Sequence, residues 1–146
     1  MLVDTNLLVY AALPTSPQHH AARQWLEGRF SDDATTVGLT WPTLYGFMRL
    51  VSSRTVAGPE AVEPERAWGA ANDFRLQPNA RMVGPGASHS FIAAELVAIP
   101  GLRSNDLPDV QLAATAIEHG LELCSYDNGF ARFPGLRWSN PIAASR

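Results

Sequence analysis

The chain has 146 residues, enough for one domain and too few for two of ordinary size. Hydrophobic residues make up 46% and charged residues 17%, which excludes a disordered chain, and the single cysteine excludes an internal disulfide framework. The formal net charge of −3 argues against strong nonspecific binding to nucleic acid. We expect one domain over residues 1–146, in the cytoplasm and without a membrane segment. No apolar run approaches the ~20 residues of a membrane helix, and the N-terminus lacks the positive region of a signal peptide.

Short apolar runs alternate with segments of helical periodicity along the chain. In order, the pattern predicts a strand at 1–4, a helix at 16–30 begun by Ser16 and Pro17, a strand at 35–39, a helix at 40–53, a loop at 54–64, a helix at 63–76, a strand at 80–84, helices at 86–99 and 104–120, and strands at 121–126 and 136–139. Strands that alternate with helices indicate an α/β fold. We therefore expect a mainly parallel sheet with helices on both of its faces.

Three aspartates fall at the carboxyl ends of this predicted sheet. Asp4 ends the first strand, Asp127 follows the strand at 121–126, and Asp109 lies in the first turn of the helix before that strand. Ligands of open α/β sheets bind at this edge, so we expect the carboxylates to converge there. Two carboxylates ~5 Å apart repel by about 3 kcal/mol at an effective dielectric constant near 20. Raised pKa values or a bound cation would offset that repulsion, and an oxygen-only ligand set suits Mg²⁺ or Mn²⁺.

Each aspartate also has a purely structural explanation. Asp4 could cap a helix that starts at Thr5 or Asn6, and Asp109 could be a first-turn carboxylate stabilised by the helix dipole. Asp127 lies in "YDNG", which is a strong turn signal and could join a hairpin. These explanations stay open at the level of the sequence.

Three segments together resemble the PIN-domain ribonucleases, and more narrowly the VapC toxins of bacterial toxin–antitoxin pairs. They are "VDTNLLVY", "SPQHHAARQWL" and "LPDVQLAATAIEHGLELCSYDNGFARFPGLRWSNP". The resemblance implies a three-layer α/β/α sandwich and Mg²⁺- or Mn²⁺-dependent endonucleolytic cleavage of a structured RNA of the tRNA or rRNA class. It also implies a homodimer and a VapB-like antitoxin partner.

The resemblance assigns roles to individual residues. It implies that Asp4, Asp109 and Asp127 hold the metal and carry catalysis. Asn6 matches the polar residue that orients the first aspartate, and Ser125 matches the small hydroxyl residue two positions before the last one. Two further residues, Arg49 and Arg132, are candidates for contacts with the substrate phosphate.

The chain departs from the family pattern at two glycines. Gly46 stands where the family usually has a glutamate in the third helix, and Gly129 stands where a second acidic residue often follows the last aspartate. A glycine inside a helix costs roughly 1 kcal/mol relative to alanine, so we expect Gly46 to provide space beside the site. With two carboxylates missing, we expect one well-bound metal at most.

Two alternative functions follow from the same residues. A degenerate PIN fold would bind RNA or a protein partner with weak or no cleavage, as Gly46 suggests. A phosphatase-like enzyme with Asp4 as nucleophile ranks last, because position 6 is asparagine and the chain has no lysine. The apolar helix around residues 41–51 is a candidate for dimer or antitoxin contact, or is an ordinary central helix covered on both sides.

Overall fold

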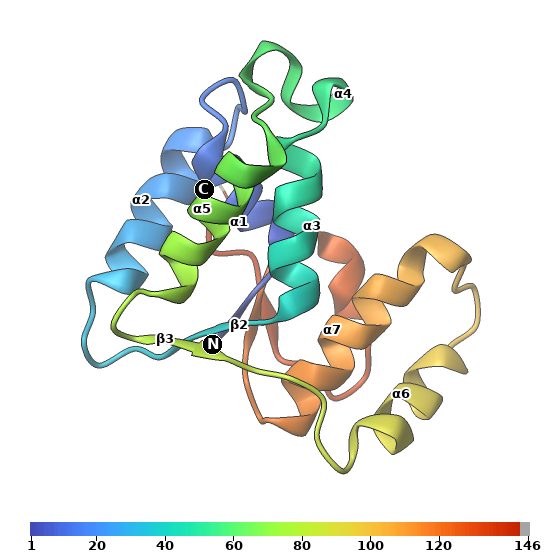
Figure 1. Cartoon of the computed structure of the whole chain (residues 1–146). Helices are drawn as coiled ribbons and strands as arrows, with labels where there is room; N and C mark the ends of the chain where they lie inside the picture. The colour runs from blue at the N-terminus through green and yellow to red at the C-terminus, as the bar shows by residue number, and fades with distance from the viewer. Residues whose placement is uncertain (144–146) are drawn as a thin grey trace.

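The computed structural model describes residues 1–143 (Figure 1). Its strands are β1 (Leu2–Val3), β2 (Val37–Leu39), β3 (Ala80–Met82), β4 (Leu123–Cys124) and β5 (Trp138–Ser139). Its α-helices are α1 (Thr5–Ala12), α2 (His19–Phe30), α3 (Trp41–Val51), α4 (Arg54–Ala57), α5 (Pro64–Arg75), α6 (His89–Val97) and α7 (Leu107–Glu118), and its 3₁₀ helices are η1 (Gly58–Glu60), η2 (Ser104–Asp106) and η3 (Asn128–Arg132). Within this part of the chain, no helix is long and apolar enough to cross a membrane.

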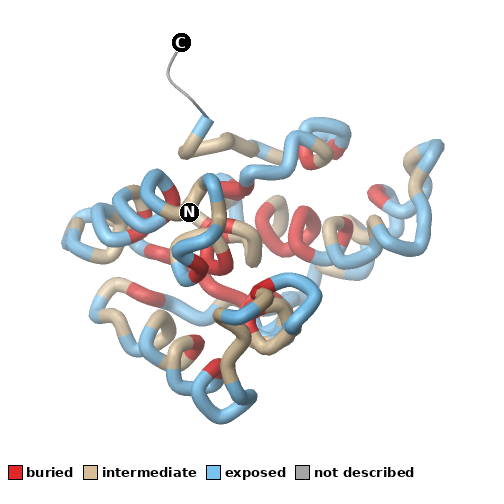
Figure 2. Tube along the Cα trace, turned by 90° about the horizontal axis from the view of Figure 1, so that it is seen from above, coloured by how far each residue is buried: buried red, intermediate tan, exposed pale blue. Residues whose placement is uncertain are grey.

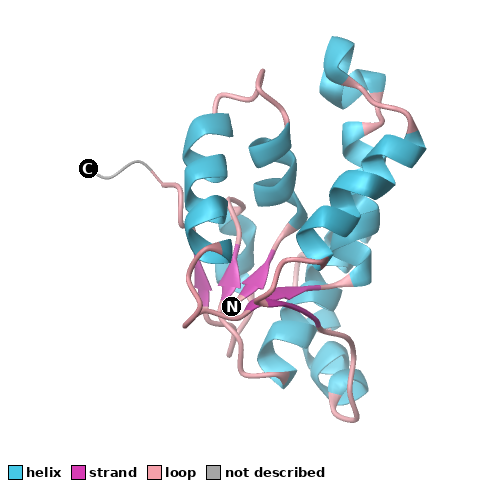
Figure 3. Ribbon diagram, turned by 60° about the vertical axis from the view of Figure 1, so that its left-hand side comes forward, coloured by secondary structure: helices cyan, strands magenta, loops and turns pink. Residues whose placement is uncertain are grey.

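The strands form one sheet in the order β3-β2-β1-β4-β5, and every neighbouring pair is parallel. β1 therefore lies in the middle, between β2 and β4. Figure 3 shows the sheet between two layers of helices. The predicted three-layer α/β/α fold with a parallel sheet is confirmed.

Each face of the sheet has its own hydrophobic core, because successive side chains of a strand point to opposite faces. In β1, Val3 packs into the core formed with α1, α2, α3 and α5, whereas Leu2 packs into the core formed with α6, α7 and η3. Both side chains are fully buried. Figure 2 shows buried residues along the inner segments and exposed ones around the rim. With a core on each side, the carboxyl end of β1 has a fixed position in the molecule.

Three details of the predicted elements are wrong. The helix predicted from Ser16 begins at His19. The Ser16 carbonyl instead accepts the His19 N–H in a turn, and Gln18 occupies the N-cap position without a side-chain hydrogen bond to the helix N–H groups. The segment predicted as a loop at 54–64 contains α4 and η1. The "YDNG" turn does not join a hairpin, because the 3₁₀ helix η3 leads from β4 to a parallel β5.

Candidate metal centre

Asp4 occupies the position where β1 ends and α1 begins. Its backbone N–H donates to the Cys124 carbonyl at 3.0 Å, in register with β4. Its Oδ1 accepts the Thr5 N–H at 2.7 Å, which caps α1, and its Oδ2 accepts the Ser125 hydroxyl at 2.6 Å. The helix-cap interpretation is therefore correct, and the same carboxylate is also tied to the neighbouring strand.

Ser125 joins the end of β1 to the segment that carries Asp127. Its side chain is fully buried, and its Oγ accepts the Asn6 amide and the Asp127 N–H, both at 3.0 Å. The Asn6 Oδ1 in turn accepts the Tyr126 N–H at 3.3 Å. The structure thus brings Asn6 and Ser125 together beside Asp4, with Asn6 connected to Asp4 through Ser125, and their supporting role stays a prediction.

Asp127 is exposed at the end of β4, on the same edge as Asp4. Its Oδ1 accepts the Gly129 N–H at 2.7 Å and caps η3. A Cβ atom at Gly129 would lie 3.0 Å from this Oδ1. The small residue at position 129 therefore permits the close turn beside Asp127, although it supplies no ligand.

Asp109 lies in the first turn of α7 and forms an ion pair with Arg132. The Arg132 Nη2 lies 3.3 Å from the Asp109 Oδ2 and 3.2 Å from the Asp106 Oδ1. Asp106 was not among the predicted site residues. Its three-residue spacing from Asp109, which places both carboxylates on one side of the helix start, was the signal for it in the sequence. Arg132 is therefore beside the site but engaged by these two acids.

Burial and mutual repulsion disfavour the charged forms of two of the aspartates. Burial is the main cause that raises the pKa of Asp4, while the hydrogen bonds from Ser125 and Thr5 oppose it and the charge of Asp127 adds to it. Burial, followed by the charges of Asp127 and Asp4, raises the pKa of Asp109 to about 6. The three carboxylates therefore act on one another, and a bound cation would relieve the cost of keeping them ionised.

The same three carboxylates do not form a closed ligand cage. Within residues 1–143, no group of three or more His, Cys, Asp or Glu side chains is close enough together to hold a metal ion. Oxygen ligands supplemented by water suit Mg²⁺, which keeps several waters in protein sites. The donor chemistry therefore fits a hydrated divalent ion, and the assignment of Asp4, Asp109 and Asp127 as its ligands stays a prediction.

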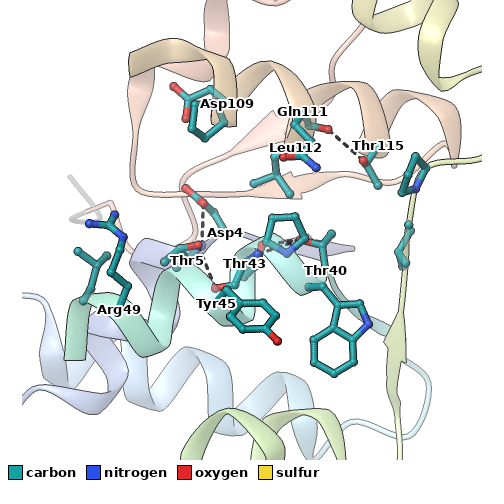
Figure 4. Close-up of a pocket in the computed structure, with 18 residues that line it drawn as sticks. Asp4, Thr5, Thr40, Thr43, Tyr45, Arg49, Asp109, Gln111, Leu112 and Thr115 are labelled. Atoms are coloured by element: carbon teal, nitrogen blue, oxygen red, sulfur yellow. Dashed lines mark hydrogen bonds between the residues drawn. The ribbon is translucent and has the colours of Figure 1, made fainter. Parts of the chain in front are cut away.

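A cavity of about 560 Å³ opens beside the carboxylates, between α3 and α7 (Figure 4). Asp4 and Asp109 line it, as does the exposed Arg49 of α3, while Asp127 lies outside its lining. Among residues 1–143, the ion pairs formed by arginine involve Arg23 and Arg132, and none involves Arg49. Arg49 is thus a cation next to the acidic edge that no carboxylate of this part of the chain neutralises.

Gly46 brings α3 close to the start of α1. A Cβ atom there would lie 3.1 Å from the Thr5 Oγ1 and 3.2 Å from its Cγ2. The Thr5 hydroxyl donates to the Thr43 carbonyl at 3.3 Å across the same contact. Gly46 lines the cavity beside the site, and a side chain there would crowd Thr5, so the glycine permits close packing of the two helices. The expectation that it also provides space for a ligand stays a prediction.

The chain that forms this fold matches a known family. The model of the PIN domain matches residues 1–136. Ribonuclease VapC37 of Mycobacterium tuberculosis is 37% identical over 97% of both chains, and ribonuclease VapC33 of the same species is 37% identical over 97% of this chain and 98% of its own. This chain belongs to the PIN-domain family and, within it, to the VapC group.

Solved structures agree with the fold. VapBC2 from Rickettsia felis, bound to a DNA fragment from its promoter, superimposes with a TM-score of 0.69 at 21% identity, covering 95% of this chain and 96% of that one. VapC20 of Mycobacterium tuberculosis, a toxin that cleaves the sarcin-ricin loop, superimposes with a TM-score of 0.67 at 20% identity, covering 93% and 98%. At these identities the likeness concerns the fold alone.

Proposed function

We propose that this protein is an endoribonuclease toxin that hydrolyses a phosphodiester bond of a structured RNA with Mg²⁺ or Mn²⁺. The observation that carries the proposal is that Asp4, Asp109 and Asp127 lie on one side of the sheet, where the charge of Asp127 helps to raise the pKa values of the other two. Beside them is a cavity lined by Arg49, which forms no ion pair among residues 1–143. Relatives that match nearly the whole chain are named ribonucleases. Such a cluster costs stability, whereas metal-dependent phosphodiester hydrolysis uses carboxylates to hold the ion.

Each residue at the edge has a role in the proposed reaction. A divalent ion, when bound, would activate water and stabilise charge on the phosphate. Asp4, Asp109 and Asp127 would hold that ion, and one of them would take the proton of the attacking water. Asn6 and Ser125 would hold Asp4 and Asp127 in place through the hydrogen bonds described above.

The substrate contacts would come from arginine and from the cavity. Arg49, which forms no ion pair among residues 1–143, would bind a phosphate oxygen, whereas Arg132 would have to leave Asp106 and Asp109 first. Sequence-specific binding of RNA depends on unpaired bases in loops. We therefore place the substrate in the tRNA or rRNA class, whose loops present such bases.

Replacing Asp4 by asparagine tests the proposal. Because asparagine caps a helix about as well as aspartate, Asp4→Asn should keep the start of α1, and circular dichroism checks that the variant folds. It should abolish Mg²⁺-dependent cleavage of total tRNA and rRNA and relieve growth inhibition in cells. Asp73→Asn, in α5, is the matched control and should still cleave RNA and inhibit growth as the wild type does. Undiminished cleavage by Asp4→Asn would refute the assignment.

A second candidate is a degenerate PIN fold that binds RNA without efficient cleavage. Two observations favour it: Gly46 lacks the usual carboxylate, and residues 1–143 contain no ready three-ligand group. Calorimetric titration with Mn²⁺ separates the two functions. Weak metal binding that Asp109→Asn does not change, together with intact RNA binding, would favour the degenerate fold.

We also propose a homodimer that a VapB-like antitoxin neutralises. Structures with similar folds include complexes titled VapBC and FitAB. Coexpression with the product of an adjacent small gene should relieve toxicity and yield a stable complex. Light scattering of the free protein should give the mass of two chains.

A further inference from the structure

The cavity beside the carboxylates is lined by a charged side chain at one end of α3 and by aromatic side chains at the other. Arg49 lines it near the end of the helix, and Trp41 and Tyr45 line it near the start. At 1.5 Å per residue, the levels of Trp41 and Arg49 differ by about 12 Å along the helix axis. Figure 4 shows Asp4 between Arg49 on one side and Thr40 on the other. A cation, two carboxylates and an aromatic wall therefore follow one another in a single cavity.

The aromatic end has a fixed geometry. The Trp41 indole stacks on Trp68 of α5 with ring centroids 6.3 Å apart and an interplanar angle of 2°. The Tyr45 ring lies 6.2 Å from Trp41 at 46°. Despite these contacts, Trp41 is 44% and Tyr45 60% exposed. Trp68 thus supports the Trp41 ring and orients it before any ligand binds, which lowers the entropy cost of stacking.

The wall of the cavity contributed by α7 is mixed, with Pro108 and Leu112 beside polar side chains. Gln111 and Thr115 line it from that helix. The Thr115 hydroxyl donates to the Gln111 carbonyl at 2.9 Å, whereas the exposed Gln111 side-chain amide can both donate and accept. A planar ligand that stacks on Trp41 or Tyr45 could therefore present its polar edge to this amide.

We propose that Trp41 and Tyr45 form a stacking subsite for an unpaired base of the RNA, next to the scissile phosphate, with Gln111 contacting the edge of that base. The inference rests on the proposed ribonuclease function, because the subsite shares its cavity with Asp4 and Asp109. About 560 Å³ lies within the usual range of small-ligand sites. Aromatic stacking of bases is a common means of holding single-stranded RNA.

The negative net charge of the chain supports an unpaired base as the group bound in this cavity. The chain carries a formal net charge of −3, and an RNA backbone is therefore held by few cations. Stacking supplies affinity that does not depend on charge. A nucleobase also needs both an apolar face and polar edge partners, and this cavity offers the two together.

Binding of short single-stranded RNA without metal tests the subsite apart from catalysis. Fluorescence anisotropy in EDTA would compare a labelled oligoadenylate with an oligomer of the same length that lacks bases. The wild type should bind oligoadenylate more tightly. Trp41→Ala should weaken oligoadenylate binding roughly 5- to 150-fold and leave the abasic oligomer unchanged. Trp41→Phe, which keeps an aromatic ring on Trp68, should restore most of the affinity.

Phe91→Ala is the matched control, because Phe91 is 76% exposed on α6 and does not line the cavity. It should leave both affinities unchanged. Equal losses for the two oligomers, or none in Trp41→Ala and Tyr45→Ala, would overturn the subsite even if the protein cleaves RNA. The subsite would also be overturned if Trp41→Ala lowered the molecular mass measured by light scattering and left the RNA affinity unchanged. The aromatic wall would then be a contact between two copies of the chain. Base-dependent binding without cleavage would support the subsite and contradict the nuclease proposal.

Discussion

At the scale of single residues, Ser125 connects three separate parts of the candidate site. Its hydroxyl donates to Asp4 and accepts from Asn6 and from the Asp127 N–H, so its hydrogen-bonding capacity is fully used. It lies in the buried interior, where an unmade hydrogen bond costs more than at the surface. Ser125 therefore serves both the stability of the edge and the orientation of its carboxylates.

Ser125→Ala should lower the free energy of unfolding by about 1–3 kcal/mol, because it removes one hydrogen bond of the half-buried Asp4 carboxylate and leaves the Asn6 amide without its partner. Urea denaturation followed by circular dichroism measures this loss. Ser139→Ala in β5 is the control, since the Ser139 hydroxyl contacts only the Cys124 sulfur at 3.9 Å among the bonds of residues 1–143, and it should change stability by less than about 0.5 kcal/mol. Equal effects of the two variants would contradict the role of Ser125.

Asp109→Asn should stabilise the metal-free protein near neutral pH. Burial and the charges of Asp127 and Asp4 raise the pKa of Asp109 to about 6 in the folded state. The folded protein thus binds this proton more tightly than the unfolded chain, so the ionised carboxylate costs stability above pH 6 and that cost disappears as the pH falls toward 4. The gain should be of order 1 kcal/mol, because solvent screens a partly exposed group.

Thermal unfolding in EDTA at pH values of about 7.5 and about 4.5 measures this effect. The melting temperature of Asp109→Asn should exceed that of the wild type at the higher pH and approach it at the lower one. Asp73→Asn should show no such dependence. A pH-independent difference would mean that Asp109 affects stability through packing and not through its charge.

At the scale of the elements, the site depends on how closely α3 approaches α1. Gly46 permits the contact, and Thr5 and Thr43 complete it with a hydrogen bond. The contact fixes the first turn of α1 and hence the carboxylate of Asp4 that caps it. A larger side chain at position 46 would therefore disturb the position of Asp4 through Thr5.

Two glycine-to-alanine variants separate helix propensity from packing. Gly69 lies inside α5, is exposed and has no atom within 4 Å of an added Cβ, so Gly69→Ala should raise the free energy of unfolding by about 0.5–1 kcal/mol. Gly46→Ala places its Cβ 3.1 Å from Thr5 and should lower that energy by about 1 kcal/mol. Urea denaturation of both variants checks the difference in sign; equal stabilisation would show that Thr5 moves freely.

At the scale of the whole molecule, the net charge limits how many phosphate groups of an RNA the protein can bind. All eleven basic residues are arginines in a chain of net charge −3, and Arg132 is engaged by two acids. Few arginines are therefore available for phosphate contacts at the acidic edge. This balance favours a specific, weakly salt-dependent complex over general attraction to nucleic acid.

The affinity for single-stranded RNA in EDTA should fall only slightly with salt. Contacts by Arg49 and Arg132 predict a slope of log K against log salt of about −1.4, at about −0.7 per phosphate. Arg49→Ala should make the slope less steep by about 0.7. Anisotropy titrations at several salt concentrations measure it. A slope steeper than about −3 would show that a basic surface elsewhere on the chain dominates binding.

Most of the elements could be predicted because their periodicity and end signals are local. Gly120, with a φ of 62°, closes α7 as its position at the end of the apolar stripe predicts. The start of α2 could not be predicted, because the local Ser-Pro signal competes with a turn that the surrounding chain stabilises. Asp106 was missed for a similar reason: Arg132, its partner, is distant in sequence and comes close only through the fold.

The sequence by itself determined the class of fold and indicated Asp4, Asp109 and Asp127 as candidate site residues. It could do so because hydrophobic periodicity, aspartates at strand ends and helix signals each depend on only a few neighbouring residues. Only the tertiary structure decided how those acids meet. It made Asp4 both a helix cap and a member of the edge, paired Arg132 with Asp106 and Asp109, and placed Trp41 in the cavity of the carboxylates. The physical reason is that hydrogen bonds, ion pairs and stacking act over a few ångströms, and residues from different elements reach such distances only after the two cores have packed against the sheet.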